Sequence, residues 1–208
     1  MSSAAQQIIS LYRRHAAAWV RARSTSLMEK HWLDRFVDPL PAGARLLDIG
    51  CGAGDPIARY LMGRGFALTG VDSSPELIAI AQEKMPAARW SVADMRELQL
   101  DQQFDGMLAW DSMFHLTPDD QRLMFPIFAA HANLGARLMF TSGPAYGDAI
   151  GEFEGEPLYH SSLDPSEYRL LLDQNGFEVV DHIVEDPDCG FRTVWLARFV
   201  RASRSGAI

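Results

Sequence analysis

Short apolar runs alternate with amphipathic stretches through the middle of this chain. Apolar runs of about four to eight residues, bounded by Gly, Pro or acidic residues, predict buried strands. The runs that fit are 46–49, 66–72, 89–92, 104–110 and 137–142, with two more at 177–184 and 192–200. The turn-rich segment between the last two runs predicts an antiparallel hairpin. Strands that alternate with helices in this way are typical of an α/β protein with a mainly parallel sheet.

Proline after a side-chain acceptor marks the predicted helix starts, because an N-cap oxygen accepts a backbone N–H and proline has none to lose in the first turn. The four pairs of this kind are Asp55-Pro56, Ser74-Pro75, Thr117-Pro118 and Asp164-Pro165. Pro126 lies inside the helix that follows Thr117. We expect it to kink that helix or to split it near Phe125.

Two segments lie outside the alternating core. Residues 3–38 contain two helical patterns, with a break at Ser24-Thr25-Ser26. Residues 143–165 form a glycine-punctuated insertion, and connections of this length are commonly lids or binding loops. We therefore expect both segments to close over a binding site and to determine which ligand it accepts.

Composition fits one globular domain of 208 residues, with 48% hydrophobic and 22% charged residues. We divide it into a helical cap (1–38), a core (39–142), an insertion or lid (143–165) and a C-terminal helix with a hairpin (166–202). No apolar run suits a signal peptide or membrane helix, which predicts a cytoplasmic protein without a membrane partner. The net charge of −8 argues against a nucleic-acid partner. Cys51 and Cys189 match no disulfide framework or zinc spacing, so no metal site is expected.

The most informative segment is residues 46–54, Leu-Leu-Asp-Ile-Gly-Cys-Gly-Ala-Gly, which predicts a strand that runs into a glycine turn. Glycines allow the backbone to approach a ligand closely and to adopt positive φ. A dinucleotide site would have a small residue where Asp55 stands, and an acid there would repel a pyrophosphate. Asp48, a second acid next to the turn, would also repel a pyrophosphate. The turn therefore favours a ligand with a positive centre and no phosphate over a nicotinamide dinucleotide.

The chain resembles the class I S-adenosylmethionine-dependent methyltransferases over about residues 45–142. Their acid-x-Gly-x-Gly-x-Gly motif is matched here, and acids follow the next three predicted strands in order. The matching positions are Asp48, Gly50, Gly52, Gly54, Asp72, Asp94 and Asp111. The resemblance implies a doubly wound, Rossmann-like, three-layer fold with seven mostly parallel strands in the order 3-2-1-4-5-7-6. Strand 7 would be antiparallel, and the N-terminal helices and the insertion after strand 5 would form a cap.

The same resemblance implies S-adenosylmethionine as cofactor, S-adenosylhomocysteine as product, and methyl transfer to an oxygen or nitrogen of a small-molecule acceptor. In-line displacement from an activated methyl group depends mainly on positioning. A non-catalytic binding or regulatory protein with the same fold is an alternative, and a nicotinamide-dependent dehydrogenase is a weaker one. The identity of the acceptor stays open, as does the choice between monomer and homodimer.

Three sets of candidate site residues follow. Asp72 is placed to bind the ribose and Asp94 the adenine, and the full cofactor set is Asp48, Gly50, Cys51, Gly52, Gly54, Asp72, Ser73, Asp94, Met95 and Trp110. Candidates for the acceptor pocket are Tyr12, Trp19, Arg23, Tyr146, Tyr159 and His160. His115 and His160 are candidate general bases, although each could instead hydrogen-bond the backbone. For Arg23 and Glu29 we weigh an ion pair at the mouth of the pocket against a surface ion pair, and we favour the surface pair.

Overall fold

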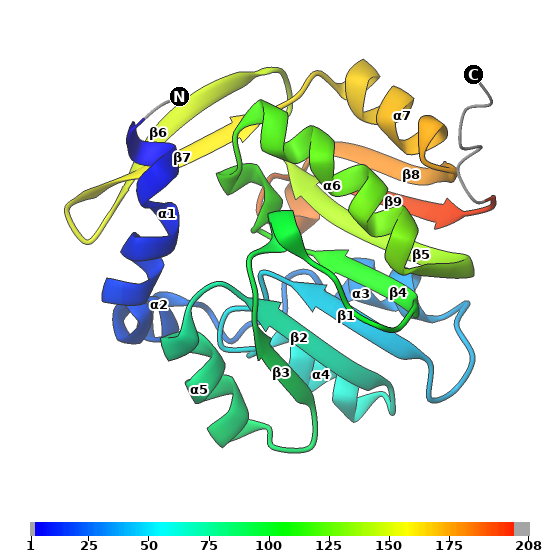
Figure 1. Ribbon diagram of the computed structural model, residues 1–208, viewed down its shortest axis with the longest axis horizontal. Coiled ribbons are helices and arrows are strands. Elements are labelled where there is room, and N and C mark those ends of the chain that lie inside the picture. The colour runs from blue at the N-terminus through cyan, green and yellow to red at the C-terminus, as the bar shows by residue number, and fades with distance from the viewer. Residues whose placement is uncertain (1–2, 202–208) are drawn as a thin grey trace.

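The computed structural model describes residues 3–201. Residues 1–2 and 202–208 of the predicted single domain lie outside the described residues. The strands of the main sheet are β1 (Arg45–Ile49), β2 (Ala67–Asp72), β3 (Arg89–Val92), β4 (Phe104–Ala109), β5 (Ala132–Ser142), β8 (Phe177–Asp186) and β9 (Arg192–Phe199). Their order is β3-β2-β1-β4-β5-β9-β8, and β9 runs in the opposite direction to the other six strands (Figure 1). With β8 and β9 counted as strands 6 and 7, this is the predicted order.

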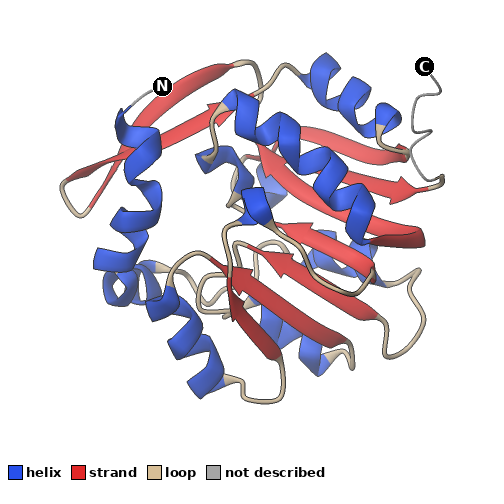
Figure 2. Cartoon of the chain, in the orientation of Figure 1, coloured by secondary structure: helices blue, strands red, loops and turns tan. Residues whose placement is uncertain are grey.

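Helices cover both faces of the sheet (Figure 2). They are α1 (Ser3–Arg14), α2 (Ala16–Ala22), α3 (Lys30–Val37), α4 (Ile57–Gly63), α5 (Pro75–Lys84), α6 (Pro118–His131) and α7 (Pro165–Gln174), with 3₁₀ turns η1 (Met95–Glu97), η2 (Met113–His115) and η3 (Pro187–Cys189). One core cluster joins the sheet to α6 and α7, and a second joins it to α3 and α4. The fold is thus the predicted three-layer, Rossmann-like arrangement.

Neighbouring strand residues divide between these two cores. Leu46 packs toward α3 and α4, whereas Leu47 packs toward α6 and α7. Met107 and Leu108 of β4 divide in the same way. Successive side chains of a strand point to opposite faces, so a strand that is covered on both sides must be apolar throughout. This is why the central strands read as continuous apolar runs.

Three of the four predicted helix starts are confirmed. The side chains of Ser74, Thr117 and Asp164 accept backbone N–H groups at the first turns of α5, α6 and α7, and proline follows each of them. The prediction for Asp55 is wrong. Helix α4 begins at Ile57, and the Asp55 carboxylate instead accepts hydrogen bonds from Arg59, one turn further along.

Two other predictions about helices need correction. Helix α6 continues across Pro126 and is not split there, because Phe125 and Phe128 anchor the adjacent turns in the core. The N-terminal segment holds three helices instead of two helical patterns, since α1 and α2 are separated at His15.

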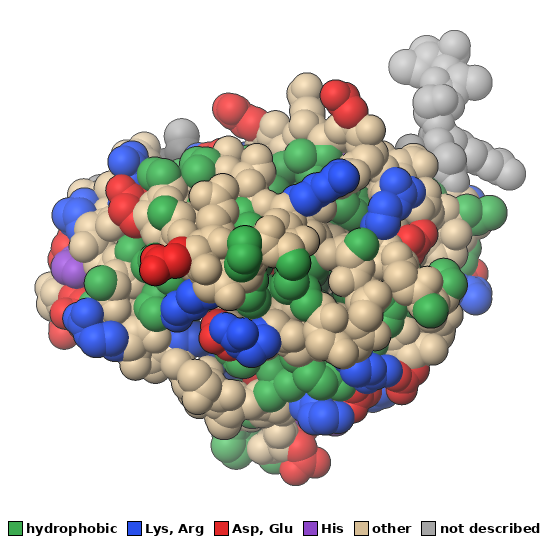
Figure 3. All heavy atoms as spheres, turned by 90° about the horizontal axis from the view of Figure 1, so that it is seen from below, with side chains coloured by type: hydrophobic (Ala, Val, Ile, Leu, Met, Phe, Trp, Pro, Cys, Tyr) green, Lys and Arg blue, Asp and Glu red, His purple; other side chains and the backbone are tan. Residues whose placement is uncertain are grey.

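None of the described helices has the length and apolar character needed to cross a membrane. Acidic and basic side chains are intermingled on the face seen in Figure 3.

The predicted insertion contains an antiparallel hairpin, β6 (Gly147–Phe153) and β7 (Glu156–Ser162), rather than an irregular loop. Glu154 and Gly155, both with positive φ, form its turn. The hairpin lies beside α1 (Figure 1), where Glu156 forms ion pairs with Arg14 and His15. The two variable segments of the chain are therefore in contact with each other.

A buried polar network fixes the hairpin to the core. Gln121 of α6 is fully buried, and its amide donates to the carbonyls of Leu116 and Ser161 at 3.0 and 2.9 Å. The Tyr168 hydroxyl donates to the Gln121 amide oxygen and lies 3.1 Å from the backbone N of Leu163, whose N–H it accepts. Helix α6, helix α7 and the end of β7 thus share one set of hydrogen bonds.

We expect Gln121→Leu to lower the free energy of unfolding by about 2–4 kcal/mol, because each buried polar group left without a partner costs roughly 1–3 kcal/mol. Urea denaturation measures the change. Leu123→Ala, on the exposed side of the same helix, serves as the control and should change stability by less than about 0.5 kcal/mol. Equal losses in the two variants would contradict the structural role of the network.

Candidate functional site

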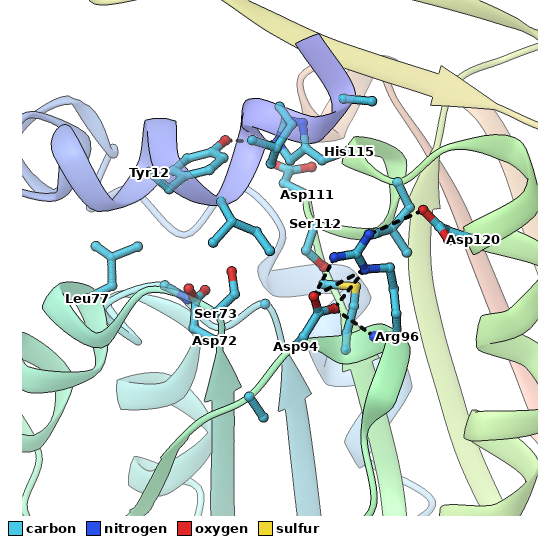
Figure 4. Close-up of a pocket in the computed structure, with 18 of the residues that line it drawn as sticks. Tyr12, Asp72, Ser73, Leu77, Asp94, Arg96, Asp111, Ser112, His115 and Asp120 are labelled. Carbon is cyan, nitrogen blue, oxygen red and sulfur yellow. Dashed lines mark hydrogen bonds and ion pairs between the residues drawn. The ribbon is translucent and has the colours of Figure 1, made fainter. Parts of the chain in front are cut away.

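The carboxyl ends of β1, β2, β3 and β4 meet beneath the N-terminal helices, as expected for an open parallel sheet. Two adjoining cavities lie there. The strand-end cavity lies between α1 and the ends of the strands, and among its lining residues are Ile8, Tyr12, Asp72, Asp94 and His115 (Figure 4). The glycine-turn cavity lies on the other side of the turn after β1. Both cavities share Trp19, Gly50, Gly52 and Asp111.

The glycine turn is packed so closely that two of its positions exclude a side chain. A Cβ at Gly50 would lie 2.4 Å from the Ser112 Cβ, and one at Gly54 would lie 2.6 Å from side-chain atoms of Met85 and Trp90. Both glycines also have positive φ. Gly52 lines both cavities, and a Cβ there would have only the Trp19 indole nitrogen within 4 Å, at 3.4 Å, so a ligand can approach bare backbone at this position.

Asp72 ties the glycine turn to the start of α5. One of its carboxylate oxygens accepts the backbone N–H of Gly52, the other accepts that of Ser74, and both N···O distances are 2.8 Å. Burial raises the pKa of Asp72, while these hydrogen bonds act in the opposite direction. Asp72 and Ser73 both line the strand-end cavity.

The glycine-turn cavity carries charges of both signs. Asp48, Arg23 and Lys84 line it, together with Cys51 and Trp110. Burial and the nearby Asp72 carboxylate raise the pKa of Asp48 to about 7, and Arg23 opposes that shift. The indole N–H of Trp110 is buried and has no hydrogen-bond partner among the described residues. This cavity therefore offers cations and an acid to a ligand.

The pair of Arg23 and Glu29 is buried, contrary to the surface pair expected from the sequence. Glu29 is fully buried, and Nη2 of Arg23 lies 2.7 Å from one of its carboxylate oxygens. Glu29 is buried at the start of α3. Its ion pair holds Arg23 at the wall of the glycine-turn cavity. Arg23 thus belongs to this cavity, next to the glycine turn.

Asp94 and Arg96 form the far wall of the strand-end cavity. Asp94 caps η1, and Nε of Arg96 lies 3.0 and 3.2 Å from the two Asp94 oxygens. The guanidinium also lies 3.5 Å from Asp120 of α6 (Figure 4). Arg96 holds the pKa of Asp94 below its usual range. The Asp94 carboxylate therefore already has a partner at the position expected to bind adenine.

Tyr12 and His115 connect the cap to the core. Nδ1 of His115 lies 2.8 Å from the carbonyl oxygen of Tyr159, which can only accept, so Nδ1 carries the proton. Burial lowers the pKa of His115 to about 4, so the ring is neutral at pH 7 and its Nε2 is an acceptor. The Tyr12 hydroxyl lies 2.8 Å from that nitrogen and must donate to it. Burial, Asp72 and Asp111 all raise the pKa of Tyr12.

Asp111 stands where the two cavities meet. Its φ of 48° is in the left-handed region, and its backbone N–H donates to the Thr141 hydroxyl at 2.9 Å. Arg192, at the start of β9, donates to both carboxylate oxygens of Asp111 at 2.7–3.0 Å. The orientation of Asp111 is therefore fixed from behind by a second element of the fold.

The predicted acceptor-pocket residues do not all come together. Tyr12 and Trp19 line the strand-end cavity, whereas Tyr146, Tyr159 and His160 are absent from the lining of both cavities. Tyr146 is exposed, and the buried Tyr159 donates its hydroxyl to Asp148 at 2.9 Å. The His160 ring packs 4.8 Å from that of His115. The hairpin therefore supports the cavity wall from outside and does not form it.

Sequence reasoning missed several lining residues. Arg96, Ser112, Leu116 and Asp120 line the strand-end cavity, as do Ile8 and Ile9 of α1. Ile8 could have been found from the sequence, because it lies four residues before Tyr12 on the same face of the predicted helix. Nothing in the local sequence distinguishes Arg96 or Asp120, because they come together only through the packing of α6 against η1.

Comparison with known proteins supports one family. Residues 46–133 match the model of a methyltransferase domain. Trans-aconitate 2-methyltransferase of Variovorax paradoxus is 31% identical over 97 residues, which cover 45% of this chain and 37% of the relative. Magnesium-protoporphyrin O-methyltransferase of Rhodobacter capsulatus is 37% identical over 98 residues, 44% of this chain and 42% of the relative. The chain spans about two fifths of the length of these curated relatives.

A solved structure shares the fold over nearly the whole chain. It is 1,6-didemethyltoxoflavin-N1-methyltransferase of Burkholderia thailandensis, with bound 1,6-didemethyltoxoflavin and S-adenosylhomocysteine. The alignment covers 97% of this chain and 92% of that one, with a TM-score of 0.72 and 20% identity. At this identity the likeness concerns the fold alone.

The raised pKa of Asp48 predicts how stability depends on pH. An unfolded Asp titrates near 3.9, so between about pH 4 and 7 the folded chain retains a proton that the unfolded chain has lost. Stability that depends on Asp48 is therefore lost as pH rises toward 7. We therefore compare the free energies of unfolding of Asp48→Asn and the wild type. Between pH 5 and pH 8, their difference should shift in favour of the variant by about 2–3 kcal/mol.

Denaturant unfolding at the two pH values measures this effect. Asp55→Asn, in the same turn but partly exposed, is the control. Its free energy of unfolding should differ from that of the wild type by the same amount at both pH values. Parallel stability profiles for Asp48→Asn and the wild type would contradict the burial of a protonated Asp48.

Proposed function

We propose that this chain, which belongs to the class I S-adenosylmethionine-dependent methyltransferases, transfers the methyl group of S-adenosylmethionine to a small-molecule acceptor. One observation carries the proposal. A cavity with both a cation and an acid adjoins a second cavity with a ribose-binding type of carboxylate, and bare glycine backbone separates them. This division matches a ligand with an amino-acid end and a nucleoside end.

The strand-end cavity fits the nucleoside. Asp72 retains further lone pairs for two ribose hydroxyls, because each of its oxygens accepts only one backbone N–H among the described contacts. Ser73, Met95 and Leu116 line the space beyond it, where a planar base would lie. Asp94 would meet the adenine amino group only alongside Arg96, with which it is already paired.

The glycine-turn cavity fits the amino-acid end. Arg23 would pair with the carboxylate, and Asp48, beside the carbonyl of Trp110, would face the ammonium group. A cation there favours the ionised form of Asp48, so binding would shift its pKa downward. Arg23, which we had placed in the acceptor pocket, is thus reassigned to the cofactor.

When bound, S-adenosylmethionine supplies a methyl group on a positively charged sulfur, which a nucleophile can displace in line. The residues of the chain contribute position and exclusion of water, which can account for about 7–11 kcal/mol of a barrier. Tyr12 and Trp19 cover the point where the cavities meet. His115 is a weak base because burial lowers its pKa to about 4, which argues against a strong general base in this site.

A catalytic role is preferred to a purely binding one because the strand-end cavity extends past the nucleoside position to Tyr12 and His115. Incubation with S-adenosylmethionine labelled in its methyl group and fractionated small-molecule extracts tests this choice. Labelled product that is lost in Asp72→Ala supports transfer. Tight cofactor binding without any labelled product would favour the non-catalytic alternative.

We expect Asp72→Ala to weaken binding of S-adenosylmethionine and S-adenosylhomocysteine by about 2–4 kcal/mol, since two hydrogen bonds to a charged acceptor are lost at ~1–2 each. Calorimetric titration measures the affinity. Asp173→Ala, exposed on α7 and outside the lining of both cavities, should bind as the wild type does. Unchanged affinity in Asp72→Ala, or wild-type protein that binds NAD and neither of these ligands, would refute the cofactor assignment.

Arg23 can be tested without leaving Glu29 as an unpaired buried charge. The double variant Arg23→Gln/Glu29→Gln should bind S-adenosylmethionine about 10–100-fold more weakly than Glu29→Gln alone, because it loses a charge-assisted contact. Decarboxylated S-adenosylmethionine should bind the two variants equally. A similar loss for both ligands would show that Arg23 does not contact the carboxylate.

A further inference from the structure

Tyr12 presents only lone pairs to the strand-end cavity. Its proton is used in the hydrogen bond to His115, which is itself oriented by the Tyr159 carbonyl. Three separate segments, α1, η2 and β7, hold this arrangement. An acceptor that reaches the Tyr12 oxygen must therefore bring a hydrogen-bond donor of its own.

The charges around this point disfavour an anion. The carboxylates of Asp72, Asp94, Asp111 and Asp120 line the strand-end cavity. Within residues 3–201, the guanidinium groups that form ion pairs with these carboxylates are those of Arg192, with Asp111, and Arg96, with Asp94 and Asp120. One sulfonium charge on a bound cofactor would still leave the carboxylates in excess. A carboxylate acceptor would thus meet repulsion and no free guanidinium.

Aromatic rings add a second preference for positive charge. The Trp19 ring meets the Tyr12 ring edge to face at 5.3 Å, and both residues line the cavity. Ring faces attract cations, and this attraction is stronger where water is excluded. The neighbouring Phe153 stacks on Tyr12 at 6.5 Å from behind and fixes the orientation of its ring.

We propose that the methyl acceptor is a small amine whose N–H donates to the Tyr12 hydroxyl oxygen, and that the acidic wall selects it over carboxylates and other anions. The inference rests on the proposed function and narrows it to a substrate class. An amine that arrives as an ammonium loses one proton to water before reaction. Its nitrogen lone pair then forms the bond to the methyl carbon as the carbon–sulfur bond breaks, and that electron pair stays on sulfur.

The test uses two probes on one skeleton, 2-phenylethylamine and phenylacetate, titrated into protein saturated with S-adenosylhomocysteine. Loading is measured first, so a failure of S-adenosylhomocysteine to bind counts against the proposed function and not against the substrate class. With loading established, we expect the amine to bind at least about tenfold more tightly than the carboxylate. Equal affinities, tighter binding of phenylacetate, or no binding of either probe overturns the inference.

Two variants test Tyr12 itself. Tyr12→Phe keeps the ring and removes the acceptor oxygen, and we expect the variant, when saturated with S-adenosylhomocysteine, to lose most of the preference for the amine. Phe153→Leu loosens the packing behind Tyr12 without touching the cavity, so it should retain the preference. A preference that survives in Tyr12→Phe, or is lost equally in both variants, contradicts recognition by the hydroxyl oxygen.

Discussion

The site depends on one half-buried carboxylate. Asp72 accepts the backbone N–H groups of Gly52 and Ser74, so it joins the turn after β1 to the helix start after β2. Removing a carboxylate from water is costly, and the two hydrogen bonds offset part of that cost. The spacing of the two strand ends is thereby set before any ligand binds. Ligand affinity then need not offset the ordering of this turn, which is the physical meaning of preorganisation.

Local sequence patterns were sufficient to predict the elements of the core. The strands, three helix caps and the glycine turn follow from patterns within a few residues, because buried strands, N-caps and close backbone approach each require particular residue types. The strand order was expected from the family resemblance and not from such patterns. The contacts that complete the cavities join residues far apart in sequence. Tyr12 meets His115 103 positions away, and Arg192 meets Asp111 81 positions away. No local pattern encodes such pairs, so the sequence indicated the residue types without their partners.

The wrong predictions have the same origin. Pro126 does not split α6, because burial of Phe125 and Phe128 outweighs the loss of one helical hydrogen bond. The insertion reads as a loop because its strands are short and polar, yet β6 and β7 pair with each other and the hairpin is held by Gln121 and Glu156. Glu29 lies beneath Arg23 because α3 packs against the sheet. In each case tertiary packing overrode the local preference.

The division of charge between the two cavities also determines which end of a ligand each cavity can bind. The glycine-turn cavity offers Arg23 and Asp48, which together match a zwitterion, whereas the strand-end cavity offers carboxylates whose guanidinium partners are already engaged. A ligand bound in the reverse orientation would place its carboxylate among Asp72, Asp94 and Asp120, and like charges at such distances repel strongly in a site of low dielectric constant. The same arrangement that orients the cofactor therefore makes the space near Tyr12 acidic. In the function and substrate class proposed here, orientation of the cofactor and selection of the acceptor are two consequences of a single charge pattern.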